Sequence, residues 1–352
     1  MNIADFDPEA ACAANGSCFG FPFTEEESRV VLVTVPWDVT VSYGSGASRG
    51  PEAVIEASTQ LDFFDAMGPD LWRRGIATVE AGGGLAELSQ RLRAEAVRVI
   101  AHLESGGAAD ESVAGAIAAV NEGCRRMNRT VYERCAALYA AGKIAGLIGG
   151  DHSVSYGAIK AAGEAAGEMG VLHIDAHCDL REAYEGFEFS HASVMYNVLR
   201  DVPQVSRIVE VGVRDFCRSE YSLASSSERV RMFDGRTLAR NRFGGVTWER
   251  QCREIVGALP GKVYISFDID GLSHELCPHT GTPVPGGLTF DEAVYLIEAV
   301  AESGREIVGF DVVEVVPGGD DRTDGIVGAR IVWKLAVAAL AAEENREGKI
   351  EY

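Results

Sequence analysis

Four short segments of the sequence concentrate aspartate, glutamate and histidine, whose side chains commonly bind metal ions. They are residues 149–153 (GGDHS), 175–179 (DAHCD), 268–271 (DIDG) and 311–317 (DVVEVVP). Carboxylates packed at close range repel one another and resist ionisation. Because Lys and Arg do not occur in these segments, bound cations are the expected counter-charge. The sequence therefore predicts a metal centre.

The candidate ligands form a mixed set of oxygen and nitrogen donors. They are His152, Asp175, His177, Asp179, Asp268 and Asp270. Such a set suits Mn²⁺ and other hard or borderline divalent ions, and the thiolates of a structural zinc site are missing. Six ligands exceed what one ion with an open position takes from protein, so we expect two ions that share bridging carboxylates. Such a pair supplies hydroxide at neutral pH by lowering the pKa of a bridging water.

The spacing within two segments predicts how the ligands converge. The three ligands of DAHCD alternate, and so do the two of DIDG, so extended backbone would project each set to one side. By the same alternation Cys178 points away, and we interpret it as a buried bystander. We interpret His173, in the apolar run before DAHCD, as a residue packed behind the ligands.

Alternating strands and helices must position these segments. The predicted strands are 30–35, 144–148, 171–174, 208–213, 263–267 and 307–313. The predicted helices are 51–58, 85–103, 112–141, 155–168, 248–259, 289–303 and 329–344. This alternation predicts an α/β fold with parallel strands and helices on both faces of the sheet. The four segments fall at carboxyl ends of strands, where ligand sites of such sheets lie.

Composition narrows the class of protein. The 352 residues carry a formal net charge of -21, which argues against nucleic acid or an anionic membrane as a partner. Eight cysteines without a C-x-x-C pair indicate reduced thiols in a cytoplasmic protein. The N-terminus does not resemble a signal peptide. We expect an N-terminal extension over residues 1–28 and one domain over residues 29–352.

The four segments, in this order, resemble the ureohydrolase family of arginases and agmatinases. The resemblance runs from about Val30 to the final helix and includes 280–287 (TGTPVPGG). It implies an arginase-like three-layer α/β/α fold with a mostly parallel sheet of about eight strands. It also implies a homotrimer or homohexamer that binds a small cationic guanidino substrate.

The resemblance also implies roles for individual residues. His152, Asp175, Asp179 and Asp268 would hold or bridge to one metal, and His177, Asp175, Asp268 and Asp270 the other, with Mn²⁺ usual and Ni²⁺ the alternative. The implied catalytic residues are Asp175, Glu314, which pairs with the guanidinium, and His191, which passes a proton to the departing amine. A metal-bridging hydroxide would attack the guanidinium carbon, giving urea plus an amine or ammonia.

Some positions depart from the family pattern and leave the substrate open. Ala192 stands after His191 where the family often has Gly, and His279 stands where Gly is usual. Residues 180–187 resemble an agmatinase-like branch that includes free-guanidine hydrolases. We expect Tyr184, His279 and Thr282 to contact substrate, together with Glu314 and His191.

Pocket shape would separate the possible substrates. A tight pocket closed by Tyr184, His279 or Trp37 would favour guanidine, and an open channel would favour an agmatine-like amine. A deacylase on the same broad fold and a non-catalytic subunit of a hetero-oligomer are the competing classes of protein. The first resembles mononuclear zinc enzymes that lack the paired carboxylates, and the second usually shows lost ligands, whereas none is lost here.

Overall fold

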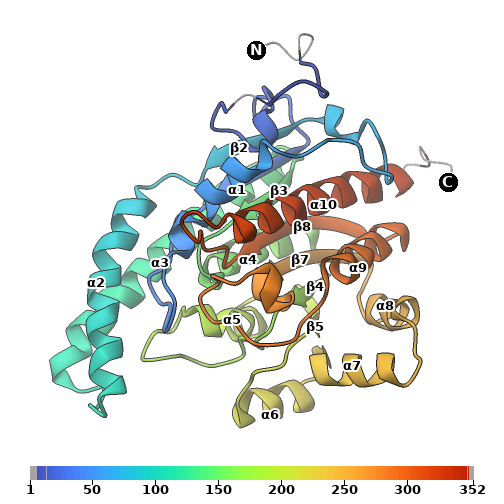
Figure 1. Ribbon diagram of the computed structural model, residues 1–352. Helices are drawn as coiled ribbons and strands as arrows, with labels where there is room; N and C mark the ends of the chain where they lie inside the picture. The colour runs from blue at the N-terminus through green and yellow to red at the C-terminus, as the bar shows by residue number, and fades with distance from the viewer. Residues whose placement is uncertain (1–5, 13, 347, 349–352) are drawn as a thin grey trace.

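Eight parallel strands form the central sheet of the computed structural model, which describes residues 6–12, 14–346 and 348 (Figure 1). Their order across the sheet is β2-β1-β3-β8-β7-β4-β5-β6, and every neighbouring pair is parallel. The strands are β1 (Val30–Thr34), β2 (Ile76–Glu80), β3 (Ile144–Ile148), β4 (Met169–Ile174), β5 (Val205–Val211), β6 (Val230–Phe233), β7 (Lys262–Asp268) and β8 (Glu306–Val313). The expected α/β class and eight-stranded sheet are confirmed.

Helices cover both faces of this sheet and complete three layers (Figure 1). Those that pack on one face are α1 (Gly50–Ser58), α8 (Trp248–Gly257), α9 (Phe290–Glu302) and α10 (Thr323–Arg346). Those on the other are α2 (Leu85–Glu104), α3 (Glu111–Ala140), α4 (Ser155–Ala166) and α5 (Val194–Asp201). The remaining two are α6 (Arg218–Ser226) and α7 (Gly235–Phe243). We call the face of the sheet covered by α1, α8, α9 and α10 the α10 face, and the face covered by α2, α3, α4 and α5 the α4 face.

The sequence missed the two strands at the edges of the sheet. All six predicted strands are present, but β2 and β6 were not predicted. Both edge strands become partly exposed toward their carboxyl ends and include the charged residues Glu80 and Arg231. Edge strands commonly carry such residues, so their apolar signal is weak. The short helices α5, α6 and α7 were missed as well.

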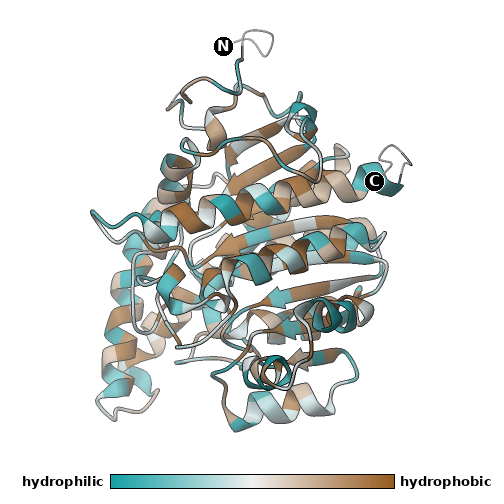
Figure 2. Cartoon of the chain, turned by 45° about the vertical axis from the view of Figure 1, so that its right-hand side comes forward, coloured by the Kyte–Doolittle hydropathy of each residue, from teal (hydrophilic) through white to brown (hydrophobic). Residues whose placement is uncertain are grey.

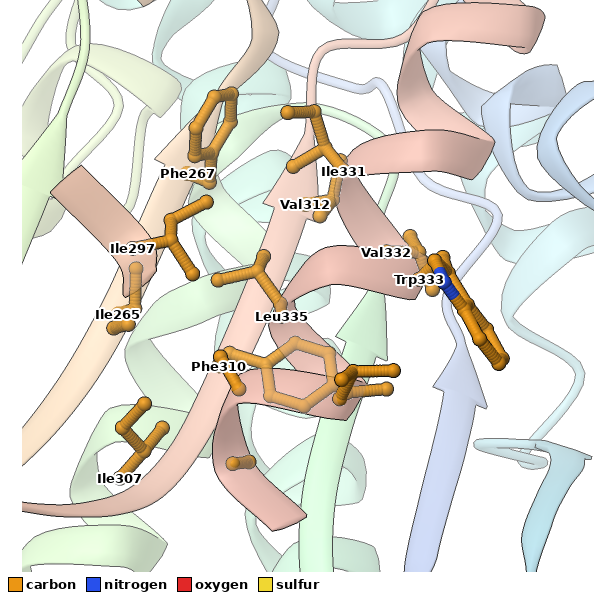
Figure 3. Close-up of a cluster of buried hydrophobic side chains, with 14 of the residues drawn as sticks. Ile265, Phe267, Ile297, Ile307, Phe310, Val312, Ile331, Val332, Trp333 and Leu335 are labelled. Atoms are coloured by element: carbon orange, nitrogen blue, oxygen red, sulfur yellow. The ribbon is translucent and has the colours of Figure 1, made fainter. Parts of the chain in front are cut away.

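An apolar core lies between the sheet and α10. Figure 2 shows the strands largely in the brown of apolar residues. In Figure 3, Phe267 of β7 and Phe310 of β8 lie near Leu335 of α10, and all three are fully buried. Of the described helices only α10 is long and apolar enough to cross a membrane, but 83% of its most apolar stretch is buried in the protein. It is therefore placed as a core helix.

Residues from the predicted N-terminal extension contribute to the same core. Phe19 and Phe21 are buried. Their rings lie 5.2 and 6.4 Å from that of Trp333 on α10. The boundary at residue 28 stays a prediction, and residues 1–5 and 349–352 lie outside the described part of the chain. All eight cysteines are free, as expected.

Candidate metal centre

Four neighbouring strands at the centre of the sheet end in the four predicted segments. The order of the sheet places β3, β8, β7 and β4 side by side. Parallel strands all point their carboxyl ends to the same edge, so residues far apart in sequence meet there. The structure brings all six candidate ligands together at this edge.

The first group of ligands surrounds His152. Its Nδ1 atom lies 3.0 Å from Oδ2 of Asp175, 3.1 Å from Oδ2 of Asp179 and 3.3 Å from Oδ2 of Asp268. All four side chains are buried. Four donor atoms from three segments thus converge on one point and form one candidate ion site.

The second group of ligands lies toward solvent and shares Asp175 with the first. Nδ1 of His177 lies 3.2 Å from Oδ2 of Asp270 and 3.4 Å from Oδ1 of Asp175. The side chain of His177 is 26% exposed, whereas Asp175 and Asp270 are buried. Asp175 therefore turns one oxygen to each group, as expected of a bridging carboxylate.

The prediction that extended backbone aligns the ligands is wrong. β4 ends at Ile174, and Asp179 has a φ of +53°, in the left-handed region. Asp268 caps a 3₁₀ turn and accepts a hydrogen bond from the backbone N–H of Asp270 at 2.8 Å. The ligands converge because both segments turn sharply after their strands.

Burial disfavours the ionised form of the carboxylates in this cluster. Burial raises the pKa of Asp268 well above its ordinary value, and Asp270 and Asp175 raise it further. Burial also favours the neutral form of Asp175, but the imidazoles of His173, His152 and His177 outweigh it and hold the Asp175 pKa well below its usual range.

Two donor atoms of the cluster support a fit to metal ions. Among the described residues, Nδ1 of His152 and Oδ2 of Asp270 are buried and have no hydrogen-bond partner. Buried polar atoms without a partner are costly, and coordination to a cation removes that cost. The donor set therefore fits divalent ions, which His152 and Asp270 would help to hold together with Asp175.

His173, predicted to pack behind the ligands, and Cys178, predicted to be a buried bystander, both lie near the ligands. Nε2 of His173 lies within the first group but is hydrogen-bonded to Oδ2 of Asp175 at 2.8 Å. We therefore assign His173 to holding Asp175. Cys178 is fully buried, and burial raises the pKa of its thiol, so it stays protonated.

A cavity of about 470 Å³ opens from the second group of ligands. His177 and Asp179 line it, together with three of the predicted substrate contacts, Tyr184, His191 and Thr282. The rings of Tyr184 and His191 lie edge to face at 6.1 Å. The cavity has the size of ordinary small-molecule sites.

Glu314 and His279, also predicted as substrate contacts, are not among the residues that line this cavity. Glu314 is buried, and its Oε1 atom accepts a hydrogen bond from the backbone N–H of His152 at 2.9 Å. Its φ of +60° is unusual for a residue other than glycine. His279 instead bonds through Nδ1 to Asp324 at 2.8 Å. Trp37 is fully buried.

His191 is held in a neutral state. Burial lowers its pKa to about 3, with smaller contributions from His177 and His152. Its backbone N–H donates to Oγ1 of Thr40 at 3.1 Å, and Thr40 in turn lies beside the buried Asp151. A neutral imidazole on the cavity wall can accept a proton.

Several cavity residues escaped the sequence analysis. Among them are Tyr43, Arg181, Asp215, Phe216 and Glu220. Asp215 and Phe216 closely follow the predicted strand 208–213, and the rule that sites lie beyond strand ends could have found them. Tyr43 lies in a loop whose position over the cavity could not be predicted from the sequence.

Comparison with known proteins gives a consistent result. Residues 28–338 match the model of the arginase family. The chain is 36% identical over 309 residues to an N(1)-aminopropylagmatine ureohydrolase of Thermus thermophilus, covering 88% of this chain and 89% of that protein. It is 31% identical over 293 residues to the agmatinase of Bacillus anthracis, covering 83% and 85%.

A solved structure supports the fold. The agmatine ureohydrolase of Thermoplasma volcanium superposes with a TM-score of 0.70 at 23% identity, covering 92% of this chain and 94% of that one. The matched family model spans the whole sheet and all six candidate ligands. The chain belongs to the arginase family of hydrolases, as its four motifs predicted.

Proposed function

We propose that this protein hydrolyses a guanidino compound that carries a second cationic group at the end of an alkyl chain, releasing urea and an amine. The observation that carries the proposal is the convergence of Asp175 with His152 on one side and His177 on the other. This pair of ion sites opens into a cavity with a carboxylate at its rim. The ureohydrolases and agmatinases among its relatives support the same reaction class.

The six predicted ligands would hold two divalent ions. Two such ions at this site would supply Lewis acidity and an activated water at neutral pH. The dominance of carboxylate oxygen over nitrogen in the donor set favours Mn²⁺, and Ni²⁺ is the alternative.

The chain's own residues would bind the substrate and move its protons. The reaction forms a bond between the guanidinium carbon and a water oxygen and breaks the bond from that carbon to the chain nitrogen. Neutral His191 would take a proton released as the first bond forms and give it to the departing nitrogen. Glu314 would pair with the guanidinium, and Tyr184 would pack on the alkyl chain.

The shape and charge of the cavity favour a long substrate over free guanidine. Of the three residues that could have closed a tight pocket, only Tyr184 lines the cavity. In the cavity wall, Arg181 lies 3.7 Å from the buried Glu220. Asp215, by contrast, is exposed and has no ion pair among the described side chains. Asp215 is therefore the carboxylate available to a terminal ammonium.

The competing protein classes lack comparable support. A mononuclear deacylase does not need the second group of ligands, and a non-catalytic subunit does not need all six. A homotrimer or homohexamer and a cytoplasmic location remain part of the proposal, and light scattering of the purified protein tests the assembly.

The test is urea release after reconstitution with Mn²⁺ and Ni²⁺ separately. The panel is free guanidine, agmatine, an aminopropyl-extended agmatine, arginine and an N-acetylated polyamine, the last assayed for acetate. We expect the amine-tailed guanidines to give the highest kcat/KM. Preferred turnover of guanidine would contradict the substrate assignment, and acetate release without urea would contradict the reaction.

Asp215→Asn sharpens the test of the substrate. Loss of an exposed ion pair of up to about 1 kcal/mol predicts that KM for amine-tailed substrates rises about two- to fivefold at unchanged kcat. Free guanidine, which has no tail, is the matched control and should be turned over as before. An equal effect on both substrates would remove Asp215 from the proposed tail site.

A further inference from the structure

One layer beneath the metal ligands, a row of four polar residues crosses four adjacent strands. In the register of the sheet, Glu210 of β5 pairs with His173 of β4, His173 pairs with Ser266 of β7, and Ser266 pairs with Asp311 of β8. All four are fully buried. The residues directly before them, Val209, Leu172, Ile265 and Phe310, belong to the core on the α10 face. Because side chains alternate along a strand, the row lies on the α4 face.

Two members of this row each contact a metal ligand, and Asp311 supports one of the two. Nε2 of His173 lies 2.8 Å from Oδ2 of Asp175. Oγ of Ser266 lies 2.9 Å from Nε2 of His152 and donates to Oδ1 of Asp311 at 2.9 Å. Asp311 is fixed in turn by the backbone N–H of Phe267, at 3.3 Å.

The direction of these hydrogen bonds decides which nitrogen of His152 can bind a metal. The Ser266 hydroxyl has one proton, and the Asp311 carboxylate accepts it. Oγ of Ser266 can then only accept a hydrogen bond from His152, so Nε2 carries a proton. In the neutral imidazole that binds a metal ion, the free lone pair is therefore on Nδ1. Nδ1 is the atom that faces the three ligand carboxylates.

We propose that Ser266 and Asp311 are positioning residues that fix the tautomer and orientation of His152, and so preorganise the first metal site. This inference rests on the metal centre of the proposed function and goes beyond it by assigning two residues that contact no substrate. The opposite tautomer would place a proton between Nδ1 and the carboxylates, where it competes with the ion. Outer partners of this kind commonly tune metal affinity by about 10–100-fold.

The test measures metal affinity without relying on activity. Metal-free protein is titrated with Mn²⁺, with the bound ions counted by elemental analysis. For Ser266→Ala, which removes the acceptor for Nε2–H, we expect the Kd of the tighter site to rise about 10–100-fold. Asp311→Asn should act in the same direction, because its amide can donate to Oγ of Ser266. The melting temperature of each metal-free variant separates this effect from loss of folding.

Glu210→Gln is the matched control. Glu210 is in the same row and equally buried, but has no hydrogen bond to a metal ligand, so its substitution should leave the Kd within about twofold. The inference is overturned if Ser266→Ala and Asp311→Asn bind two ions as tightly as the unmodified protein, or if Glu210→Gln weakens binding equally. If Ser266→Ala does not fold, Asp311→Asn alone decides. An unmodified protein that binds fewer than two ions would instead refute the proposed function.

Discussion

The two faces of the central sheet are built from alternate residues of the same strands but differ in chemistry. On the α10 face, Ile265 and Phe267 of β7 and Phe310 and Val312 of β8 are apolar to the ends of the strands. On the α4 face, Ser266 and its neighbours form the polar row described above. Because successive side chains of a strand point to opposite faces, one strand can contribute to the apolar core on one face and support the metal site on the other.

The difference shows where stability is given up for function. Apolar residues on the α10 face gain free energy by burial, whereas Glu210 on the α4 face is buried with both carboxylate oxygens unpaired by hydrogen bonds among the described residues. Proteins commonly accept such local cost at functional sites. Substitutions on the two faces should therefore separate folding from metal binding.

The largest effect is expected on the polar side, at the shared ligand. Asp175→Ala removes an oxygen from both ion sites, so both ions should be lost or weakened and urea release should fall at least about a thousandfold. This exceeds the range typical of outer partners. Elemental analysis and urea assays measure it. His191→Ala is the control: it should retain both ions but lose about 10²-fold or more in kcat. Full activity in Asp175→Ala would remove the site assignment.

Substitutions on the α10 face of the same strands should lower stability without changing metal affinity. Phe310→Ala leaves a cavity beneath α10, and truncation of a buried Phe destabilises proteins by about 3–5 kcal/mol. We expect a lower urea-denaturation midpoint but an unchanged Mn²⁺ Kd at temperatures where the variant is folded. A large loss of metal affinity in the folded variant would show that the two faces are not separable.

The sequence predicted the metal ligands because they form dense polar clusters after apolar runs. Of the supporting row it predicted only His173, because Ser266 and Glu210 are single polar residues within apolar strands. Their meaning depends on which strands are neighbours and in what register. The sharp turns at Asp179 and after Asp268 were missed for a related reason: they depend on caps made with residues that follow, such as the Met195 and Tyr196 N–H groups that bond the Asp179 carbonyl.

The smallest effect should appear at the outer end of the row, as a dependence on pH. Burial raises the pKa of Glu210 well above its ordinary value, and Asp175, Asp179 and Glu220 raise it further, while the nearby Cys178 thiol offsets this only in part. A raised folded-state pKa means that the native protein holds a proton that the unfolded chain releases. The stability linked to this group is therefore complete at pH values below the ordinary glutamate pKa and is lost as pH rises.

Glu210→Gln removes that dependence, because an amide is neutral at every pH. Both proteins are measured in the presence of a chelator, so that metal release does not contribute. The melting temperature of the variant should equal that of the unmodified protein near pH 4.5 and exceed it by a few degrees at pH 8. Thermal scans at several pH values measure this difference. A variant that is less stable at pH 8 would mean that the carboxylate is charged and paired in the native state. The α4 face would then carry no stability cost at this position, and the contrast between the two faces would be confined to the ligands themselves.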